Sequence, residues 1–362
     1  MKKQKILFDC REFNPYRRTG ISRFLEGLIS ALIEANSTLK IFLATFDPKF
    51  VPSSLIPHKN IEVMRIRRGF FSSEYAMRSL TRQGFSLFIS PYPKIPIFSK
   101  SCCKAINTIH DVFYISLPIY RKNFKTFFDR IRLRAALNCA ATTWYVSSWS
   151  LKETEKLVGH SGTNPKIRYN GIENRFFKKI TEQQNISKEK YKLEGDYILV
   201  LGNGRPHKNI GVLLEISKQI DKTIVFAGVS KAQQNYWLSR PQKVGHKWIE
   251  HIPDDDLPAL IRESFCLAHP STAEGFGFPP LEAMASGVPA VVSSIPVLIE
   301  TTGGNALTAD PHEPNSWITA FQALENKNLY RAQVEKGTKW AERLRSGKAW
   351  GKHIADIENV LR

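Results

Sequence analysis

The sequence lacks any run of about 18 apolar residues, so it offers no candidate for a membrane-spanning helix. It has no low-complexity segment, and its composition of 42% hydrophobic and 23% charged residues excludes disordered and fibrous proteins. Its five cysteines show neither metal-ligand nor redox spacing, which is typical of reduced thiols in the cytosol. The first residues, Met1-Lys2-Lys3-Gln4, lead directly into a strand-like run, so we expect no signal peptide. The 362 residues favour two domains over one large core.

Acidic residues are scarce in one half of the chain. The whole sequence has 52 Lys+Arg against 33 Asp+Glu, a formal charge of +19. Residues 1–170 hold 28 of these bases and only 11 of the acids, whereas residues 171–362 are close to neutral. Such an uneven balance indicates a polyanionic partner, either nucleic acid or an anionic membrane surface, rather than a general effect on solubility.

Two basic clusters in the first half also carry large apolar residues. Residues 120–139 are predicted to form a helix, because Phe124, Phe127, Phe128, Ile131 and Ala135 recur at a spacing of three and four with basic residues between them. Such a helix either lies on an anionic membrane or, as is more common, packs its apolar stripe into a core. Near the run of bases at 65–68, residues 69–71 (Gly-Phe-Phe) are predicted to lie in a loop, which makes them the better candidate for membrane contact.

Strand-like runs alternate with helical patterns in both halves of the chain, which predicts an α/β fold with parallel, doubly wound sheets. Two such blocks in tandem predict two Rossmann-like domains that face each other across a cleft. Ligands of these sheets bind beyond the carboxyl ends of the strands, so the loops that follow the strands are the candidate sites.

The segment after residues 266–269 combines features of an anion site and a sugar site. Gly275 and Gly277 allow a close approach of the backbone to a ligand, and the next helix begins with two prolines and offers its free N–H groups to a phosphate. Glu274 and Glu282 flank this anion site, and carboxylates are suited to accept hydrogen bonds from sugar hydroxyls. The combination predicts a site for a nucleoside diphosphate sugar.

The spacing of Glu274 and Glu282 resembles the signature of retaining GT-B glycosyltransferases of the family 4 type (glycosyl transferases group 1), in particular mannosyltransferases. The similarity continues at residues 19–21, 109–111, 169–172, 202–209, 287–289 and 309–311. The resemblance implies the GT-B fold, with an acceptor-binding domain at 1–170, a linker at 171–195 and a donor domain at 196–340. It leaves a C-terminal helix at 341–362 that packs back on the first domain.

The resemblance also implies roles for residues of the donor domain. Glu282 resembles the acid that holds the nucleotide ribose, and Glu274 the acid that contacts the donor sugar. Lys208 matches the lysine that neutralises the diphosphate, where Arg205 is expected to assist because Asn203 stands at the position of the usual arginine. The expected donor-binding set is completed by Gly275, Phe276, Gly277 and Phe278, with the backbone N–H groups of Phe276 and Gly277 toward the sugar or diphosphate.

In the first domain, His110 matches the histidine that contacts the donor sugar and is expected to act with the catalytic residues Glu274, Lys208 and Arg205. Its neighbour Asp111 either caps the following segment or orients His110. The loop of Arg17, Arg18, Thr19 and Gly20 is a candidate acceptor or phosphate contact. The three aspartates at 254–256 are interpreted as a helix N-cap and not as a metal site.

These features predict a retaining enzyme that moves a hexose, most simply mannose from GDP-mannose, onto a lipid-linked, lipopolysaccharide or exopolysaccharide glycan. No metal and no cofactor is expected, since the nucleotide sugar is a substrate. The expected location is the cytoplasm, peripherally on the inner face of an anionic membrane, and nucleic acid is not expected as a partner because no recognition motif occurs. The alternatives are a UDP-hexose-dependent enzyme of the same fold and a non-catalytic basic binding protein.

Overall fold

The computed structural model describes residues 4–15, 18–36, 38–93, 103–121, 123–178, 187–238 and 246–362. Four groups of residues considered above lie outside these ranges: Met1 to Lys3, Arg17 of the loop before residue 20, Cys102 among the five cysteines, and Lys122 in the basic segment 120–139. The chain forms two compact units. Unit 1 contains Met1–Gly171 together with Ser346–Arg362, and unit 2 contains Ile172–Arg345. The chain thus leaves unit 1 at the turn dipeptide where the sequence divides into two blocks and returns to it for the last 17 residues.

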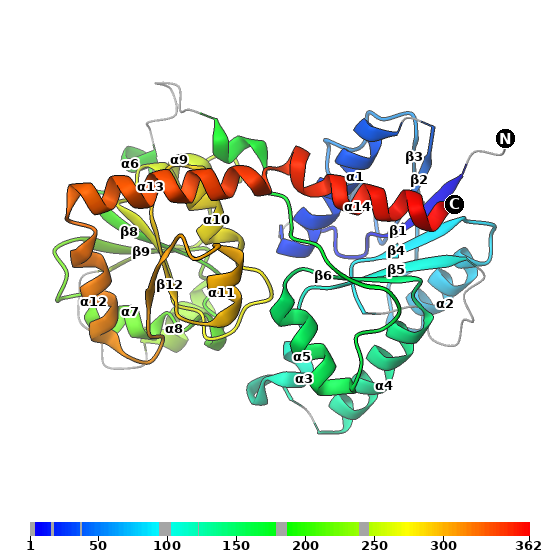
Figure 1. Cartoon of the computed structure of the whole chain (residues 1–362), viewed down its shortest axis with the longest axis horizontal. Helices are drawn as coiled ribbons and strands as arrows, with labels where there is room; N and C mark the ends of the chain where they lie inside the picture. Colours follow the sequence, from blue (N-terminus) through cyan, green and yellow to red (C-terminus); the bar gives the residue numbers. More distant parts are fainter. Residues whose placement is uncertain are drawn as a thin grey trace. The chain divides into compact units, whose positions relative to one another are not determined.

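Unit 1 is built on a parallel sheet in which the described strands follow the order β3-β2-β1-β4-β5-β6-β7 (Figure 1). The strands are β1 Lys5–Asp9, β2 Lys40–Thr45, β3 Ile61–Arg65, β4 Leu87–Ser90, β5 Lys104–Ile109, β6 Thr142–Tyr145 and β7 Pro165–Ile167. The central strands are almost wholly buried, as expected of a parallel sheet that is covered on both faces. The strand order reverses between β1 and β4, and ligands of such sheets bind at this switch point.

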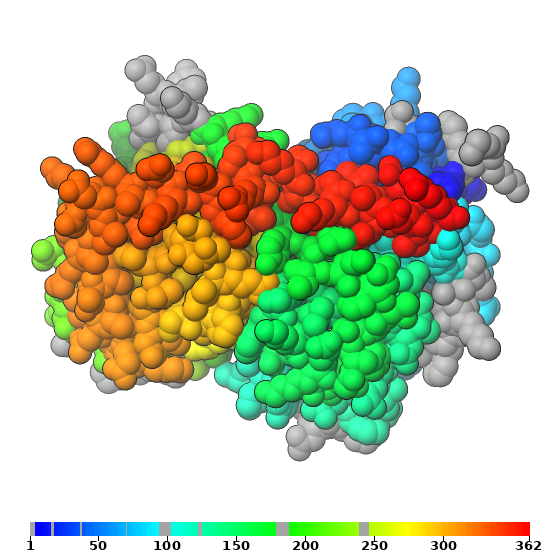
Figure 2. Space-filling model, viewed as in Figure 1, coloured from blue at the N-terminus to red at the C-terminus, as the bar shows by residue number. Residues whose placement is uncertain are grey.

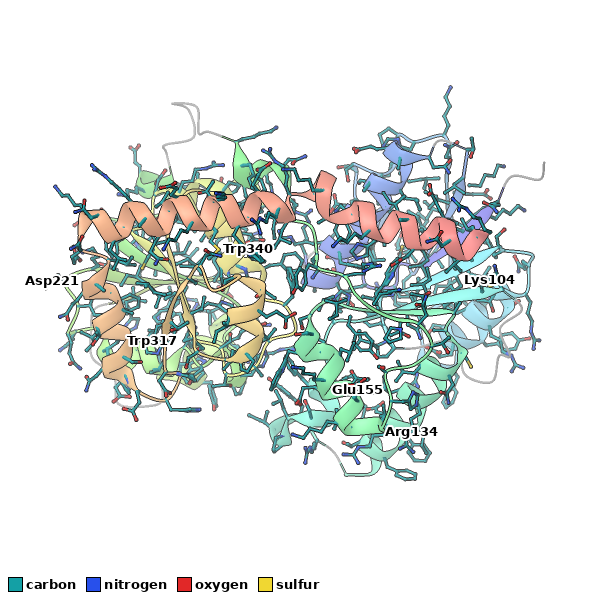
Figure 3. The ribbon with its side chains drawn as sticks, in the orientation of Figure 1. Lys104, Arg134, Glu155, Asp221, Trp317 and Trp340 are labelled. Atoms are coloured by element: carbon teal, nitrogen blue, oxygen red, sulfur yellow. The ribbon has the colours of Figure 1, made fainter. Side chains whose placement is uncertain are left out.

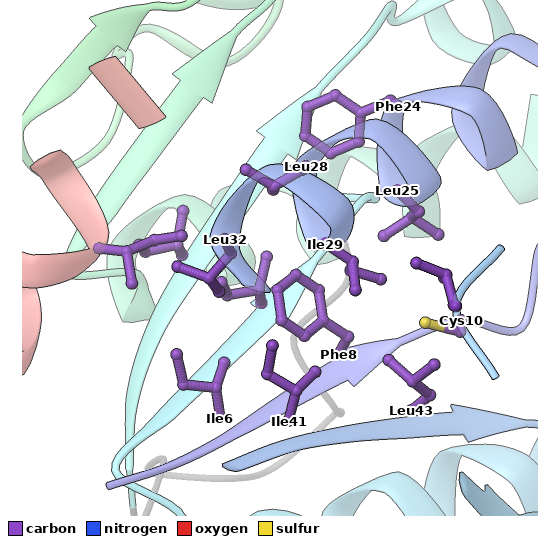
Figure 4. Packing of buried hydrophobic residues seen from close by; sticks show 14 of the residues in the cluster. Ile6, Phe8, Cys10, Phe24, Leu25, Leu28, Ile29, Leu32, Ile41 and Leu43 are labelled. Atoms are coloured by element: carbon purple, nitrogen blue, oxygen red, sulfur yellow. The ribbon is translucent and has the colours of Figure 1, made fainter. Parts of the chain in front are cut away.

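Helices cover both faces of this sheet. They are α1 Gly20–Ala35, α2 Phe70–Thr81, α3 Phe113–Ser116, α4 Asn123–Cys139, α5 Ser148–Val158 and α14 Ser346–Leu361, with short 3₁₀ turns at Pro48–Phe50 and Pro118–Tyr120. The apolar stripe of α1 faces the sheet, since Phe24, Leu25, Leu28, Ile29 and Leu32 are buried in one cluster against Phe8 and Leu43 (Figure 4). Helices α2 and α4 share a separate core with the other side of the sheet.

The C-terminal helix α14 belongs to the core of unit 1, where it lies beside α1 and also contributes to the molecular surface (Figures 1 and 2). The indole of Trp350 is 1% exposed and fills the space above two glycines. A Cβ atom would lie 2.9 Å from this ring at Gly27 and 2.6 Å from it at Gly171. The carboxylate of Asp356 then accepts hydrogen bonds from Trp144 Nε1 (2.9 Å) and from the guanidinium of Arg168 (2.7 Å). These contacts explain why a segment so distant in sequence is part of unit 1.

Unit 2 repeats the architecture with the described strands in the order β10-β9-β8-β11-β12-β13, all parallel. The strands are β8 Tyr197–Leu201, β9 Thr223–Ala227, β10 His246–Ile249, β11 Cys266–His269, β12 Ala290–Ser293 and β13 Leu307–Ala309. The helices are α6 Ser187–Lys190, α7 Gly211–Ile216, α8 Lys231–Leu238, α9 Leu257–Arg262, α10 Phe278–Ala285, α11 Pro296–Thr301, α12 Pro314–Ala323 and α13 Lys327–Ala341, with 3₁₀ turns η3 Asn174–Phe177, η5 Pro206–Lys208 and η6 Glu342–Leu344. Trp317 of α12 and Trp340 of α13, labelled in Figure 3, donate their indole N–H groups to Asp310 and Thr301. Here the strand order reverses between β8 and β11.

Two of the predictions for the basic half are wrong. Residues 70 and 71 were expected in a loop, but they form the first turn of α2. The stripe in residues 120–139 was expected most simply to pack into a core, yet Phe127, Phe128 and Ile131 are exposed. The core of α4 is made instead by Leu133, Ala136 and Leu137, because the helix turns its C-terminal half toward the sheet and α5.

Among the described helices, none combines the length and the apolar character needed to cross a bilayer.

Candidate functional site

The carboxyl ends of β8 and β11 are adjacent in unit 2, because these two strands pair at the switch point of the sheet. The loop after β8 therefore meets the loop after β11. Thr272 of the second loop donates its backbone N–H to the carbonyl of His207 in the first, at 2.8 Å. This contact brings Lys208 beside Glu274, although 65 residues separate them in sequence.

Glu274 is held from two sides. Its Oε1 atom lies 2.5 Å from Lys208 Nζ and 2.8 Å from His269 Nε2, and the residue is only 8% exposed. Ser271 Oγ lies 3.3 Å from the same imidazole nitrogen. The result is a compact buried group in which one carboxylate joins a cation from the β8 loop to a histidine at the end of β11.

The electrostatics of this group fix its protonation states. Burial alone would raise the pKa of Glu274, but Lys208 and His269 more than offset this and hold its pKa well below the usual range. Burial lowers the pKa of His269, so the imidazole is neutral at physiological pH and donates its Nε2 proton to the carboxylate. His207 is neutral as well, since burial, assisted by Lys208, lowers its pKa to about 4. The group therefore contains one carboxylate and one ammonium with neutral histidines around them.

The N-terminus of α10 lies directly after this group. Gly277 occupies the N-cap position with φ +87°, where a Cβ atom would also lie 2.6 Å from Leu298 Cδ2. This confirms the prolines expected in the first turn of the helix. Glu282 follows one turn into α10, is 1% exposed, and lies close enough to His269 for its charge to oppose slightly the lowering of the pKa of that imidazole by burial. The two acids of the predicted motif thus belong to one electrostatic neighbourhood.

The loop after β8 places its two other candidates differently. Asn203 folds back on its own turn, with Oδ1 accepting from the backbone N–H of Arg205 at 3.2 Å. The Arg205 side chain is exposed at the start of η5. Asn209 adopts a left-handed conformation (φ +50°) and donates to the carbonyl of Pro311 at 2.7 Å, which fixes the far side of the loop. Phe276 and Phe278, on either side of Gly277, form an edge-to-face ring pair with centroids 5.3 Å apart.

In unit 1, His110 directly follows β5 at the carboxyl edge of the sheet, as predicted. Its ring meets Phe24 edge-on with centroids 4.9 Å apart, and burial lowers its pKa to about 3. Its Nε2 atom is buried and finds no hydrogen-bond partner among the described residues. Asp111 Oδ1 accepts from the backbone N–H of Phe113 at 3.1 Å, in the turn that leads into α3, whose N-cap residue is Val112.

In the loop before α1, the side chains of Arg18 and Thr19 already have partners within the protein. Thr19 is the N-cap of α1 and accepts from the Ser22 N–H, and its hydroxyl donates to Glu12 Oε1 at 2.8 Å. Arg18 pairs with Glu26 at 2.7 Å. Gly20 is the first residue of the helix. Arg18 and Thr19, the two side chains of this loop that the structure describes, therefore stabilise the start of α1.

The aspartates at 254–256 do not cap α9 through a side chain. Asp256 occupies the N-cap position, but its carboxylate accepts hydrogen bonds from Lys190 (2.6 Å) and Tyr191 (2.5 Å) instead. The expected capping role is therefore wrong, because a cation and a phenol lie within reach. Within the described part of the chain, no cluster of three or more His, Cys, Asp or Glu side chains is arranged to hold a metal ion.

Sequence reasoning gave no role to His269, which contacts Glu274 directly. A signal was present, since His269 is a polar residue that ends the buried strand Cys266–His269 at the ligand-binding edge of the sheet. His207 was missed for a different reason: its proximity to Lys208 is visible in the sequence, but its burial is not.

The architecture and this site define the class of protein. The chain superposes on sucrose-phosphate synthase from Thermosynechococcus elongatus with a TM-score of 0.79 and 15% identity, covering 99% of each chain. It also superposes on HepE from Anabaena, solved in complex with UDP-glucose, with a TM-score of 0.74 and 17% identity over 98% of this chain and 99% of the other. The chain has the GT-B fold of two Rossmann-like domains.

Residues 181–340 match the glycosyl transferases group 1 family. This segment contains Lys208, Glu274 and Glu282. The chain is 27% identical over 247 residues to O-antigen chain mannosyltransferase B from Escherichia coli, a match that spans 65% of this chain and 65% of that relative.

Proposed function

We propose that this protein is a glycosyltransferase that transfers a hexose, mannose from GDP-mannose, onto a glycan of the O-antigen or lipopolysaccharide kind with retention at the anomeric carbon. The family of residues 181–340 supports the reaction class, and the name of the Escherichia coli relative supports mannose and an O-antigen acceptor. The observation that carries the proposal is the buried Lys208–Glu274–His269 group beside the N-terminus of α10.

Each member of the group has a part that suits its chemistry. Glu274 has one oxygen fixed by Lys208 and His269, and as an ionised carboxylate it has acceptor capacity left for the hydroxyls of a hexose. Lys208 has three N–H donors, so it can keep Glu274 and still meet a diphosphate oxygen. Glu282 is the acceptor for ribose hydroxyls, and the first N–H groups of α10 receive the diphosphate.

Bond breaking then depends on stabilising the departing nucleoside diphosphate. Positive charge from Lys208, from the exposed Arg205 and from the helix N-terminus lowers the energy of the charge that develops on the leaving oxygen. In retention by front-face attack, the acceptor hydroxyl forms the new C1–O bond as the bond to the diphosphate breaks, and its proton passes to the diphosphate. His110, neutral because of its burial, serves as a contact for the donor sugar and not as a base. With this positive charge in place we propose no metal and no other cofactor, so activity should survive EDTA.

The proposed acceptor also explains the charge of the basic half. A lipid diphosphate-linked or phosphorylated glycan at the cytoplasmic face of an anionic membrane would be drawn to residues 1–170. We therefore propose a peripheral location at that face.

The test is a transfer assay with radiolabelled GDP-mannose and UDP-glucose on lipid-linked O-antigen intermediates. We expect transfer from GDP-mannose, a Glu282→Ala variant with at least tenfold higher donor KM, and a Lys208→Ala variant with kcat lowered by about 10²–10³. Lys218→Ala, an exposed lysine of unit 2, is the matched control. Transfer from UDP-glucose alone would replace the donor assignment, and the absence of both transfer and donor hydrolysis would leave a non-catalytic binding protein.

A further inference from the structure

Two neighbouring helices of unit 1 expose large apolar side chains. Of the eleven large hydrophobic residues exposed in the described chain, five lie on α2 and α4. They are Phe71 (85% exposed), Tyr75 (74%), Phe127 (61%), Phe128 (49%) and Ile131 (48%), and we call them the α2–α4 patch. Within each helix the members are spaced so that they share one side, since Tyr75 follows Phe71 by four residues and Ile131 follows Phe127 by four. Burying aromatic area of this size is strongly favourable, so its exposure calls for a partner.

Helices α2 and α4 are linked in two ways, by a buried core to which both contribute and by an ion pair. Met77 and Leu80 of α2 share a buried core with Ala136 of α4. Glu74, the residue before Tyr75, lies 3.9 Å from Arg132, the residue after Ile131. A helix that joins parallel strands runs opposite to them, so the first turns of both helices lie at the carboxyl edge of the sheet. The patch therefore lies on the same edge as His110.

The position of Glu74 is itself fixed by the interior of the unit. Arg11 donates to Glu74 Oε1 at 2.9 Å and makes a two-point contact with the fully buried Asp9 at the end of β1. The aspartate and the glutamate raise the pKa of this guanidinium despite its burial. The part of α2 that carries Glu74 is therefore anchored to the interior of unit 1 through Arg11.

Charge of one sign surrounds the patch. Arg67 and Arg68 directly precede α2 and are exposed, and Lys125, Arg130 and Arg134 are exposed on α4. The only acids in the sequences of the two helices are Glu74, already paired with Arg11, and Asp129. Arg134, on the C-terminal half of α4, is labelled in Figure 3.

This combination selects among possible occupants. A second copy of the chain would place two strongly basic surfaces against each other, and like charges across an interface are unfavourable. Nucleic acid would match the charge but would gain little from aliphatic Ile131 and the edge-to-face pair of Phe127 and Phe128. A bilayer with anionic lipids satisfies both features, because aromatic rings enter the interface while Lys and Arg reach the phosphates.

We propose that the α2–α4 patch docks this protein on an anionic bilayer, with its aromatic rings in the headgroup region and the flanking bases on lipid phosphates. Docking in this way places the carboxyl edge of the unit 1 sheet, with His110, next to the membrane surface. The inference rests on the proposed function only in that a lipid-anchored acceptor would then enter unit 1 from the bilayer, whereas docking itself requires no catalysis.

The experiment is co-sedimentation of the full chain with vesicles of phosphatidylcholine alone and of phosphatidylcholine with 30% phosphatidylglycerol. We expect binding only to the anionic vesicles, weakened by salt. Arg67→Glu with Arg130→Glu should weaken it by more than 25-fold, since each base near the surface contributes about fivefold. Phe127→Ser with Phe128→Ser should weaken it by at least tenfold. All four substituted side chains are exposed, so we expect the variants to fold like the parent.

Matched controls come from unit 2. Ile299→Ser removes a 41% exposed apolar residue, and Lys218→Glu with Lys336→Glu reverses two exposed charges. Both controls should bind vesicles like the parent, apart from a small general effect of net charge. An equal loss of vesicle binding in the patch and control variants would overturn the inference. So would vesicle binding that depends on the arginines but not on the phenylalanines. A parent protein that does not bind anionic vesicles, or that self-associates through the phenylalanines, would overturn it as well.

Titration of each variant with GDP and UDP separates this inference from the proposed function. Nucleotide affinity should be unchanged by the patch variants, because the residues proposed to bind the nucleotide, Lys208 and Glu282, belong to unit 2. Vesicle binding without any nucleotide binding would leave docking intact and remove the proposed enzyme.

Discussion

Replacing Lys208 with alanine would leave a buried carboxylate with too little compensation. In the structure, Glu274 is 8% exposed and receives Lys208 at 2.5 Å and His269 at 2.8 Å. In the variant only the neutral imidazole remains. Removing one partner of a fully buried ion pair costs about 3–5 kcal/mol. Because the Lys208 side chain is 18% exposed and His269 still donates, we expect about 3 kcal/mol, the lower end of that range.

The pH dependence of this loss has a definite sign. In the parent the folded pKa of Glu274 lies below its usual value of 4.5, so the pair contributes full stability above that pH and loses it as pH falls further. In Lys208→Ala the dominant effect on Glu274 is burial, which raises its pKa, and protonation relieves the penalty as pH falls. The difference in stability between parent and variant should therefore be largest at pH 7 and shrink toward pH 5.

Hydrogen exchange of the β8 and β11 amides at pH 7 and pH 5 is the suitable assay, since the chain has two units and one global unfolding transition cannot be assumed. Lys218→Ala is the control, with no expected change. A loss below about 1 kcal/mol at pH 7, or a loss that grows toward pH 5, would refute the claim that Lys208 sets the charge state of Glu274.

Further substitutions test other parts of the structure. Gly277→Ala places a Cβ atom 2.6 Å from Leu298 at a φ of +87°. We therefore expect a loss of about 1–3 kcal/mol in thermal stability and a higher donor KM. Parent-like values of both would argue against the tight turn at this position. Glu282→Gln, which keeps size and burial, should weaken nucleotide affinity at least tenfold with little change in melting temperature, and unchanged calorimetric affinity would exclude its contact with ribose. Asp356→Asn removes the carboxylate that pairs with Arg168 inside unit 1. We expect about 2–3 kcal/mol lower stability in urea, with no change in nucleotide affinity. Unaltered unfolding would show that α14 packs on unit 1 without this ion pair.

The central architecture could be predicted from the sequence because its signals are local. The buried strands Lys40–Thr45, Leu87–Ser90 and Thr223–Ala227 are continuous apolar runs, and α1 has an unbroken helical stripe. The outer strand Ile61–Arg65 was not predicted, since it is only partly buried and its apolar residues are interrupted by Glu62.

Periodicity also fails to say which side of a helix meets solvent. The spacing of Phe127, Phe128 and Ile131 predicts a helix face correctly, but whether that face is covered depends on tertiary packing of Leu133 and Leu137 against the sheet and α5. The exposure of these side chains is therefore known only from the structure, and it supports docking on a membrane.

The candidate site was predicted in part for a similar reason. Glu274, Glu282 and Lys208 have motif spacing that is visible in one dimension. The contact of Lys208 with Glu274 and the role of His269 depend on the pairing of β8 with β11, which places two distant loops together. The use of Asn203 in its own turn, and of Asp256 with Lys190 rather than as a helix cap, depends on neighbours that the sequence does not reveal.

The most direct test of the proposed enzyme is calorimetric titration of the full chain with GDP, UDP and ADP, repeated for Glu282→Ala. We expect the protein to bind nucleoside diphosphates, GDP most tightly, and the affinity to fall at least tenfold in the variant. Binding tightest for UDP would contradict the mannose donor, and no binding of any of the three would contradict a nucleotide-sugar site built around Glu274, Glu282 and Lys208.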